Sequence, residues 1–165
     1  MKNILLFAFF VILCSSFMVS IGKSTNLWTY NYGGEYEDRA YSLIETRDGG
    51  YVIVGSTVLD NSTKCFLVKT DSNGILVWNR TYVKEVFTEG RSVVETLDGG
   101  FAIGGSVGFP AGGCDFWLIK TDSNGNVLWE KTYGRNDDNL FSLIQTIVFI
   151  YFCCFGQVSK VKIDD

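Results

Sequence analysis

The chain has 165 residues, enough for one ordinary domain, with 47% hydrophobic residues and a net charge of −4. This apolar fraction excludes disorder by composition, and the acidic balance argues against a nucleic-acid surface, which needs a basic footprint. The absence of His removes the commonest general base and metal ligand, together with any Ser-His or Cys-His nucleophile pair. Eighteen glycines and 15% aromatic residues are typical of short strands joined by tight turns.

Residues 1–22 have the pattern of a signal peptide. Lys2 provides the positive start, and Ile4 to Leu13 is an unbroken apolar run that is too short to span a bilayer. Small residues follow, with a plausible cleavage site at Ser20-Ile21-Gly22. We therefore expect export with cleavage, so that the protein is secreted or held at the cell surface. A retained N-terminal membrane anchor is the alternative interpretation.

A repeat of about 50 residues organises the rest of the chain. Ser42-Leu-Ile-Glu-Thr46 returns as Ser92-Val-Val-Glu-Thr96 and again as Ser142-Leu-Ile-Gln-Thr146. Two further segments each occur twice: Asp48-Gly-Gly-Tyr51 as Asp98-Gly-Gly-Phe101, and Leu67-Val-Lys-Thr-Asp-Ser-Asn-Gly74 as Leu118-Ile-Lys-Thr-Asp-Ser-Asn-Gly125. Tryptophans recur at one phase, each followed four residues later by a tyrosine: Trp28 and Tyr32, Trp78 and Tyr82, Trp129 and Tyr133.

Each repeat predicts four antiparallel strands. The first repeat predicts strands at 41–46, 51–58, 65–70 and 75–82, and the second at 91–96, 101–107, 115–121 and 126–133. The Asp-Gly-Gly segments predict tight hairpins because glycine accepts positive φ, and Asn73-Gly74 suits a type I′ turn. The segment Leu59 to Lys64 is predicted as a polar loop, and a lone strand of the fourth type is expected over 27–32.

The predicted fold class is all-β, with antiparallel four-stranded blades in a partial β-propeller of about two and a half blades. We expect a lone strand at 27–32, a blade at 33–82, a blade at 83–133 and the start of a third blade at 134–146. A four-stranded sheet cannot bury both of its faces alone, which is why such blades stack on one another. A two-sheet sandwich and an open β-solenoid are the alternatives.

The combined motif resembles the propeller-like repeat proteins secreted by archaea and some bacteria, most of them uncharacterised, over residues 27 to about 146. A fainter likeness is to quinoprotein-type and kelch-like blades, in which an Asp, a Gly-containing turn and a Trp dock one blade against the next. Asp71, Gly74 and Trp78 match that pattern, as do Asp122, Gly125 and Trp129. The resemblance implies that Trp78 and Trp129 dock one blade against the next. It does not imply that a quinone cofactor is bound.

The segment 147–165 departs from the repeat, because Ile147 to Phe155 is apolar where a third Asp-Gly-Gly turn is due. Three interpretations remain open. The segment is a truncation or frameshift product, or a degenerate third blade with strands at 147–154 and 158–163, or part of a short membrane segment at 140–156.

The aromatic series is expected to be structural. Because a ligand site is usually built once, the strict repetition of Trp28, Trp78 and Trp129 with Tyr32, Tyr82 and Tyr133 favours packing between blades over a carbohydrate-stacking surface. The Asp-Ser-Asn-Gly segments are explained by turn chemistry, since neither supplies the Glu of an EF-hand loop. Asn136-Asp-Asp-Asn139 is interpreted as a solvated loop, with a cation or sugar site as the alternative.

No catalytic, cofactor-binding or metal-binding residue is predicted, and the chain is not expected to be an enzyme. We expect a binding or scaffold role outside the cell, with a protein or glycan ligand, other propeller repeats or self-association through open blade faces as partners, and with no nucleic acid. The alternatives are a fragment of a quinoprotein-like or glycosidase-type propeller enzyme and a truncated, non-functional copy of a larger propeller protein.

Overall fold

The structure, a computed structural model, describes residues 28–109 and 113–134, and the backbone of 140–145, 149–154 and 157–162. Within these ranges the protein is all-β, with strands and turns and no helix. The predicted signal peptide at 1–22 and the acidic segment 136–139 lie outside the described residues.

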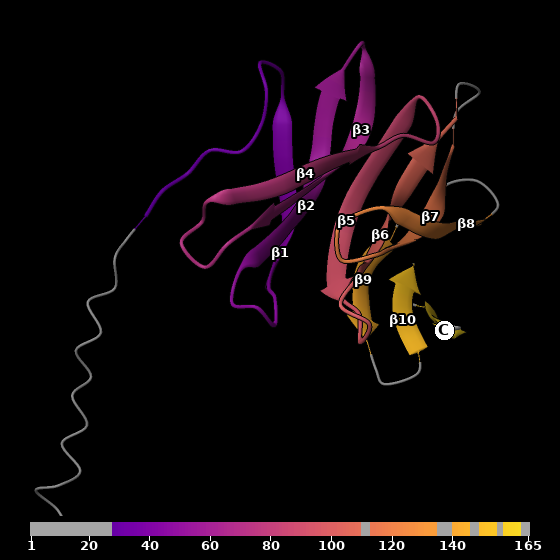
Figure 1. The fold of residues 1–165 in the computed structure, drawn as a ribbon. Coiled ribbons are helices and arrows are strands. Elements are labelled where there is room, and N and C mark those ends of the chain that lie inside the picture. The colour runs from indigo at the N-terminus through magenta and orange to yellow at the C-terminus, as the bar shows by residue number, and fades with distance from the viewer. Residues whose placement is uncertain (1–27, 110–112, 135–139, 146–148, 155–156, 163–165) are drawn as a thin grey trace, which may run out of the picture.

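The strands follow one another in three groups along the chain (Figure 1). Unit one contains β1 (Asp38–Glu45), β2 (Tyr51–Leu59), β3 (Ser62–Thr70) and β4 (Leu76–Tyr82). Unit two contains β5 (Phe87–Glu95), β6 (Phe101–Gly108), β7 (Cys114–Thr121) and β8 (Val127–Tyr133). The third group forms a separate three-stranded sheet, which we call the third sheet because it follows units one and two. It contains β9 (Leu140–Gln145), β10 (Phe149–Cys154) and β11 (Gln157–Lys162).

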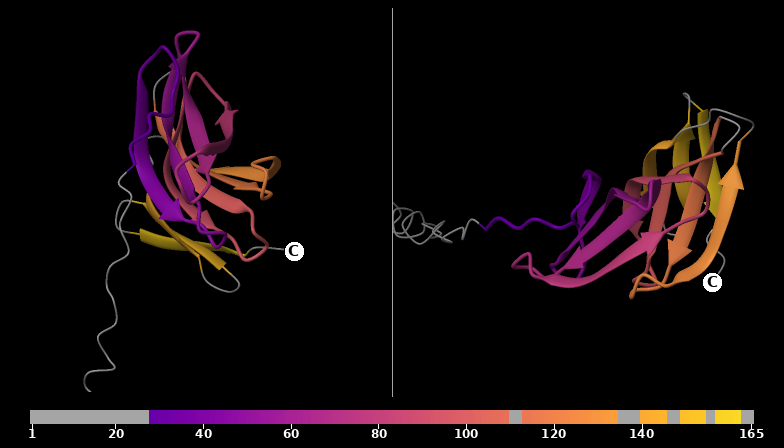
Figure 2. Two further views of the ribbon diagram at one scale, coloured as in Figure 1. Left: turned by 60° about the vertical axis from the view of Figure 1, so that its left-hand side comes forward. Right: turned by 90° about the horizontal axis from the view of Figure 1, so that it is seen from above.

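Units one and two together form one open, eight-stranded sheet that is antiparallel except at a single point. Each unit pairs its four strands in chain order, and the units are joined by one parallel bridge between Thr63 of β3 and Phe87 of β5. β9 packs against β5 and β6, so unit two lies between unit one and the third sheet (Figure 2). Consecutive antiparallel strands are what the predicted tight hairpins require.

The hairpin turns follow from their glycines, but the predicted type I′ geometry is wrong. A type I′ turn needs positive φ at both central residues, whereas Gly74 (φ 79°) has positive φ and Asn73 does not. The Gly74 N–H instead donates to the carbonyl of Asp71 at 3.1 Å, and the glycine follows the turn in the left-handed region. Gly49, with φ 80°, plays the same part between β1 and β2.

The polar loop predicted from Leu59 to Lys64 is also wrong, because β2 runs to Leu59 and β3 starts at Ser62. Only Asp60 and Asn61 lie between the strands, and both have positive φ, at 53° and 59°. Asp and Asn tolerate this region better than other residues with a side chain, so this pair makes the tight hairpin turn.

The lone strand predicted over 27–32 is not formed over 28–32, the part of it that the structure describes. A strand needs a partner for its backbone N–H and C=O groups, and no described strand pairs with this segment. The aromatic side chains of this segment nevertheless pack against unit one.

The pairing of the first two strands in the third sheet differs by one residue of register from the same pairing in units one and two. Glu45 pairs with Tyr51 and Glu95 with Phe101, but Gln145 pairs with Ile150, one residue before the position that the repeat predicts. A shift of one residue exchanges the two faces of a strand. The strands β10 and β11 lie close to the ranges 147–154 and 158–163 that a degenerate third repeat predicts. The hairpin between β9 and β10 is one residue shorter than the corresponding hairpins of units one and two.

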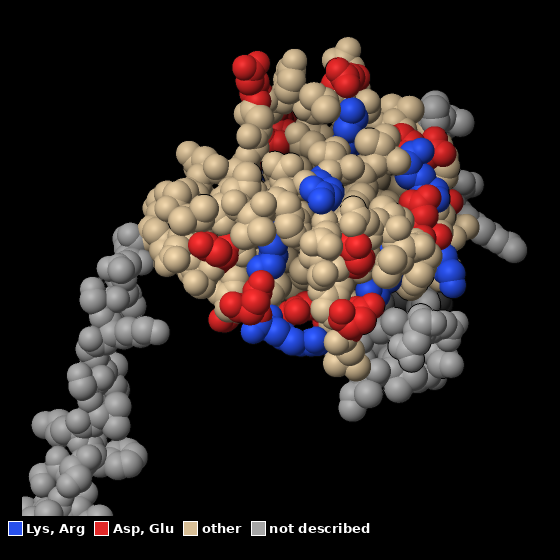
Figure 3. All heavy atoms as spheres, in the orientation of Figure 1, with Lys and Arg blue, Asp and Glu red and all other residues tan. Residues whose placement is uncertain are grey.

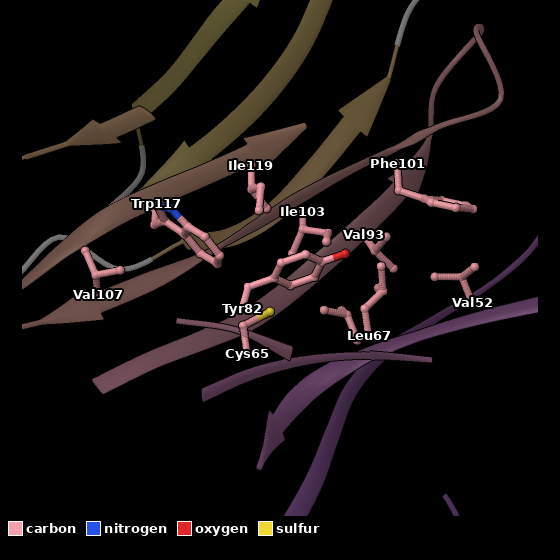
Figure 4. Close-up of a cluster of buried hydrophobic side chains, with 11 residues drawn as sticks. Val52, Cys65, Leu67, Tyr82, Val93, Phe101, Ile103, Val107, Trp117 and Ile119 are labelled. Atoms are coloured by element: carbon pink, nitrogen blue, oxygen red, sulfur yellow. The ribbon is translucent and has the colours of Figure 1, made fainter. Parts of the chain in front are cut away.

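The main core lies between units one and two. Figure 4 shows Val52, Cys65 and Leu67 of unit one facing Ile103, Ile119 and Trp117 of unit two, with Tyr82 beside them. Most of these side chains are fully buried, and together they remove the inner faces of both units from water. Since apolar burial stabilises by about 25 cal/mol per Å², this contact holds the units together far more strongly than the single parallel bridge does.

Candidate functional site

The first contact that positions the units joins the end of one unit to a turn of the next. The Trp78 ring of β4 lies so close to Gly125 that a Cβ there would be 3.0 Å from Trp78 Cζ3. The Tyr82 hydroxyl donates to the carbonyl of Gly125 at 2.8 Å, and Trp78 packs edge-on to Phe101 with ring centroids 6.0 Å apart. Gly125 thus provides both the positive φ of the turn and the space for the ring.

The segment at residues 28–33, called the N-terminal segment below, makes the same contacts with unit one. A Cβ at Gly74 would lie 2.5 Å from Trp28 Cζ3, and the Tyr32 hydroxyl donates to the Gly74 carbonyl. Trp28 also packs against Tyr51, the counterpart of Phe101, at 5.8 Å between centroids. The side chains therefore lie where the fourth strand of a preceding unit would place them, although the backbone pairs with no described strand.

The third pair of the series has a different setting. Trp129 is partly exposed, and the Lys131 ammonium lies 5.3 Å from its ring centroid. Tyr133 stacks on Phe116 with centroids 5.6 Å apart. No third Asp-Ser-Asn-Gly turn follows in the described residues, so the contact seen at Gly74 and Gly125 is not repeated there.

A buried lysine in each unit anchors the Asp-Gly-Gly hairpin, which the sequence reasoning missed. Lys69 Nζ donates to Asp48 Oδ1 (3.0 Å), Thr46 Oγ1 (3.1 Å) and the Thr70 carbonyl (2.9 Å). Lys120 Nζ donates to Asp98 Oδ2 at 2.8 Å and to the Thr121 carbonyl at 2.7 Å. The signal was present in the sequence, because Lys-Thr follows Asp-Gly-Gly in both repeats, with the Lys 21 residues after the Asp in the first and 22 in the second.

These contacts lower the pKa of both aspartates. Hydrogen bonds from Thr46 and then Lys69 lower the pKa of Asp48 to about 2. At Asp98, burial acts in the opposite direction, but hydrogen bonds from Lys120 and Thr96 still lower the pKa to about 2. Each ammonium group bonds to the Asp-Gly-Gly hairpin and to a carbonyl on the third strand of its unit, so it holds these strands together.

The Asp-Ser-Asn-Gly segments use their carboxylates within the turn. Asp71 Oδ1 accepts from the backbone N–H groups of Asn73 and Ile75, both at 2.8 Å. Asp122 makes the matching contacts with Asn124 and Asn126. Within the described ranges, no three side chains of the metal-ligating types gather in one place.

The surface of unit one that faces away from unit two is the best candidate for binding. Its apolar residues correspond in the repeat to Val93, Ile103, Trp117 and Ile119 of unit two, which are at most 2% exposed because unit one covers them. We call this surface of unit one the front face; it consists of Leu43, Ile53, Phe66 and Val68. Leu43 is 58% exposed, whereas its counterpart Val93 is 2% exposed. Ile53 and Phe66 are partly exposed, whereas Val68 is 1% exposed, so the front face is uncovered at Leu43 and only partly covered at Ile53 and Phe66.

A pocket of about 260 Å³ lies between this face and the N-terminal segment. Aromatic and aliphatic side chains provide most of its wall, with Asp38 and Arg39 as the charged members. Its lining residues are Tyr30, Asn31, Tyr32, Asp38, Arg39, Ala40, Ile53, Gly55, Phe66 and Val68. Asp38 Oδ2 accepts from the Gly34 N–H at 2.8 Å, which fixes the start of β1. Such a cavity suits a bulky apolar or aromatic group.

On the face seen in Figure 3, charged residues of the described part of the chain do not single out another surface. Figure 3 shows acidic and basic side chains interspersed over the visible face, without a large area of one sign. Beside the β1–β5 contact, Glu89 is buried and pairs with Arg91, whose guanidinium lies 4.5 Å from the Tyr41 ring centroid. The two charges of this cluster are therefore paired, and the guanidinium also lies over a ring.

No helix within the described residues is long and apolar enough to cross a membrane.

Comparison with known proteins adds no family. No protein-family model matches the chain, and a search of curated proteins finds no match to it.

Proposed function

We propose that the protein is a secreted or cell-surface repeat protein of propeller type that acts by binding or scaffolding. The observation that carries this proposal is the front face of unit one. Its counterpart on unit two is buried by a neighbouring sheet, whereas Leu43 remains 58% exposed beside a pocket of about 260 Å³. An open apolar face of this kind is typical of a surface that receives a partner.

The propeller interpretation is supported by how the units succeed one another. Each unit is a four-stranded antiparallel meander, and the Trp and Tyr of one fourth strand pack on a turn of the next unit. β9 packs on β5 as β5 packs on β1, so the first strands of successive sheets lie together. This repeated packing is what radial arrays of blades require, and it supports a packing role for Trp28, Tyr32, Trp78 and Tyr82.

The test combines localisation with cross-linking in the organism that encodes the protein. We expect a tagged chain in the medium or on the cell exterior, joined to a partner when a membrane-impermeant cross-linker is added. Leu43→Glu should abolish the cross-linked product, because a carboxylate on the front face opposes apolar contact. A chain that stays inside the cell, or a product indifferent to Leu43→Glu, would contradict the proposal.

Leu128→Glu is the matched control. Leu128 lies on β8 and is 57% exposed, almost the same as Leu43. Its counterpart Val77 on β4 remains 58% exposed even though unit one makes an interface with unit two. This edge position therefore stays in solvent when sheets pack, and the control should keep the cross-linked product.

A shortened copy of a larger repeat protein is the second candidate, and the register of the third sheet favours it. Pairing of Gln145 with Ile150 differs by one residue from the first two units, and no Asp-Gly-Gly turn stands between these strands. The observation that decides is the DNA downstream of the gene. Further repeats in another reading frame would support a shortened copy, and their absence would count against it.

A further inference from the structure

Two segments of unit one have the Asn-X-Ser/Thr pattern at which a sugar is attached to asparagine in exported proteins. We call Asn61-Ser-Thr63 the first sequon and Asn79-Arg-Thr81 the second sequon. The binding role proposed above uses neither of them. Both asparagines are exposed, so exposure alone does not separate the two sequons. Their backbones differ, however, and this difference determines how easily an enzyme can act on each.

The first sequon lies at the tip of the hairpin that projects at the top of Figure 1, where the chain already reverses direction. Asn61 is one of two residues between Leu59, which ends β2, and Ser62, which begins β3, and its φ is 59°. The backbone of Thr63 is held by the bridge to Phe87, while its partly exposed side chain lines a pocket of about 100 Å³. Exposed turn tips are where enzymes that modify folded chains act most readily.

The second sequon lies within a strand that is held on both sides. Asn79 is in the middle of β4 and pairs with Val68 of β3. Trp78 before it and Tyr82 after it both contact Gly125 of unit two. To bend β4 into the active site of an enzyme would therefore break the ladder with β3 and the contact between the units. We expect Asn79 to be a poor acceptor in the folded chain.

The fold shared by the two units does not require the first sequon. Cys114 holds the position of Thr63 in unit two, so a hydroxyl group is not needed there. The segment that joins β6 to β7, residues 109–113, contains no asparagine. The positive φ accounts for an Asn at position 61, but it sets no requirement on position 63. The combination of Asn61 with Thr63 is thus a feature of unit one alone.

We propose that Asn61 carries an N-linked sugar and that Asn79 does not. In the transfer, Asn61 Nδ2 loses a proton and forms a bond to the anomeric carbon of a sugar that is carried on a lipid diphosphate. The bond between that carbon and the diphosphate oxygen breaks, and the lipid diphosphate leaves with the electron pair. This inference rests on the export proposed above, because the pattern marks a surface loop of a secreted protein.

The experiment is peptide mapping by mass spectrometry on the full chain exported by the organism that encodes it. The wild-type peptide that contains Asn61 should be heavier by at least one sugar residue. Asn61→Gln and Thr63→Ala should both abolish this increase. Thr63→Ser keeps the hydroxyl and Asn79→Gln leaves the first sequon intact, so these matched controls should keep the sugar. An exported wild-type chain with an unmodified Asn61, or with a sugar on Asn79, would overturn the inference.

A second measurement tests the structural preference without the cell. The purified, folded full chain is incubated with an oligosaccharyltransferase and a sugar on a lipid diphosphate. Asn61 should be modified at least about tenfold faster than Asn79, because β4 must first leave both β3 and Gly125. Equal rates would overturn the argument from the backbone.

The outcomes separate this inference from the proposed function. An exported chain without a sugar, which still cross-links to a partner through Leu43, contradicts only the assignment of Asn61. A chain that stays inside the cell contradicts the proposed location. If that chain is nevertheless modified at Asn61 in the purified reaction, Asn61 is supported as the preferred acceptor.

Discussion

Units one and two have the same strands and turns but very different burial. Every residue of β6 is buried, whereas its counterpart β2 contains buried, partly exposed and exposed residues. Unit two has a neighbouring sheet on each side, and unit one has a sheet on one side and a short segment on the other. Burial in a repeat protein is thus set by neighbours, so equivalent substitutions should have unequal effects in the two units.

The largest difference is expected at the central aromatic position of the third strand. Trp117 is 1% exposed and its indole N–H donates to Glu130 at 3.0 Å, while its counterpart Phe66 is partly exposed. Trp117→Ala should lower the free energy of unfolding by about 4 kcal/mol, and Phe66→Ala by about 1.5 kcal/mol. Urea unfolding measures both, and equal losses would show that the front face is covered as well as its counterpart on unit two.

The next difference concerns the bulge position of the first strand. Gly90→Ala places a Cβ 2.4 Å from Val54 and 2.8 Å from the Cys65 sulfur, which should cost about 2 kcal/mol through overpacking. Ala40→Gly removes a methyl group where no sheet is packed and should cost about 0.5 kcal/mol. The same urea series tests this pair, and a stable Gly90→Ala variant would show that the units can separate slightly without loss.

The lysine anchors should differ because Lys120 has fewer alternative acceptors than Lys69. Asp98→Ala leaves the ammonium of Lys120, whose side chain is 2% exposed, with the Thr121 carbonyl as its remaining acceptor, and should cost about 1.5 kcal/mol. Asp48→Ala should cost about 1 kcal/mol, because Lys69 keeps Thr46 and the Thr70 carbonyl. Thermal unfolding measures both, and a larger loss in Asp48→Ala would reverse this comparison.

The tyrosine hydroxyls provide a smaller test of the turn contacts. Tyr82 is 7% exposed and bonds to Gly125 at 2.8 Å, so Tyr82→Phe should cost about 1 kcal/mol. Tyr32→Phe should cost about 0.5 kcal/mol, since the N-terminal segment is more exposed and can rearrange. Hydrogen exchange at the 71–75 and 122–126 turns would localise each loss, and an unchanged 122–126 turn in Tyr82→Phe would contradict the assigned contact.

The smallest effect is expected on acidification, and it should be shared by both units. Asp48 and Asp98 have pKa values lowered to about 2, against about 3.9 in an unfolded chain. Their contribution to stability is therefore complete above about pH 4 and is lost as the pH falls toward 2. Since both carboxylates are more than half exposed, we expect less than about 1 kcal/mol from each. Unfolding of the Asp48→Asn, Asp98→Asn double variant should vary less between pH 4 and 2 than that of the wild-type chain, and an equal variation would assign the acid sensitivity elsewhere.

Some of the architecture follows from the sequence alone. The repeat of Ser-Leu-Ile-Glu-Thr, Asp-Gly-Gly and Asp-Ser-Asn-Gly locates eight strands to within a few residues, because alternation and turn glycines are local properties. The phase of the Trp and Tyr series predicts one shared environment. Four of the six residues make repeated contacts with a turn glycine, whereas Trp129 and Tyr133 have a different setting.

Other features depend on contacts between residues that are distant in the chain. Whether residues 28–32 form a strand is decided by a pairing partner, and the burial of Lys69 and Lys120 is decided by hairpins that lie more than twenty residues earlier. Asp60-Asn61 makes a tight turn only because β2 and β3 remain paired to their ends. The repeat could predict a front and a back on each sheet, but the difference between Leu43 and Val93 comes from what covers each sheet. That is a property of the assembled array, because identical local sequences acquire different burial when their neighbours differ.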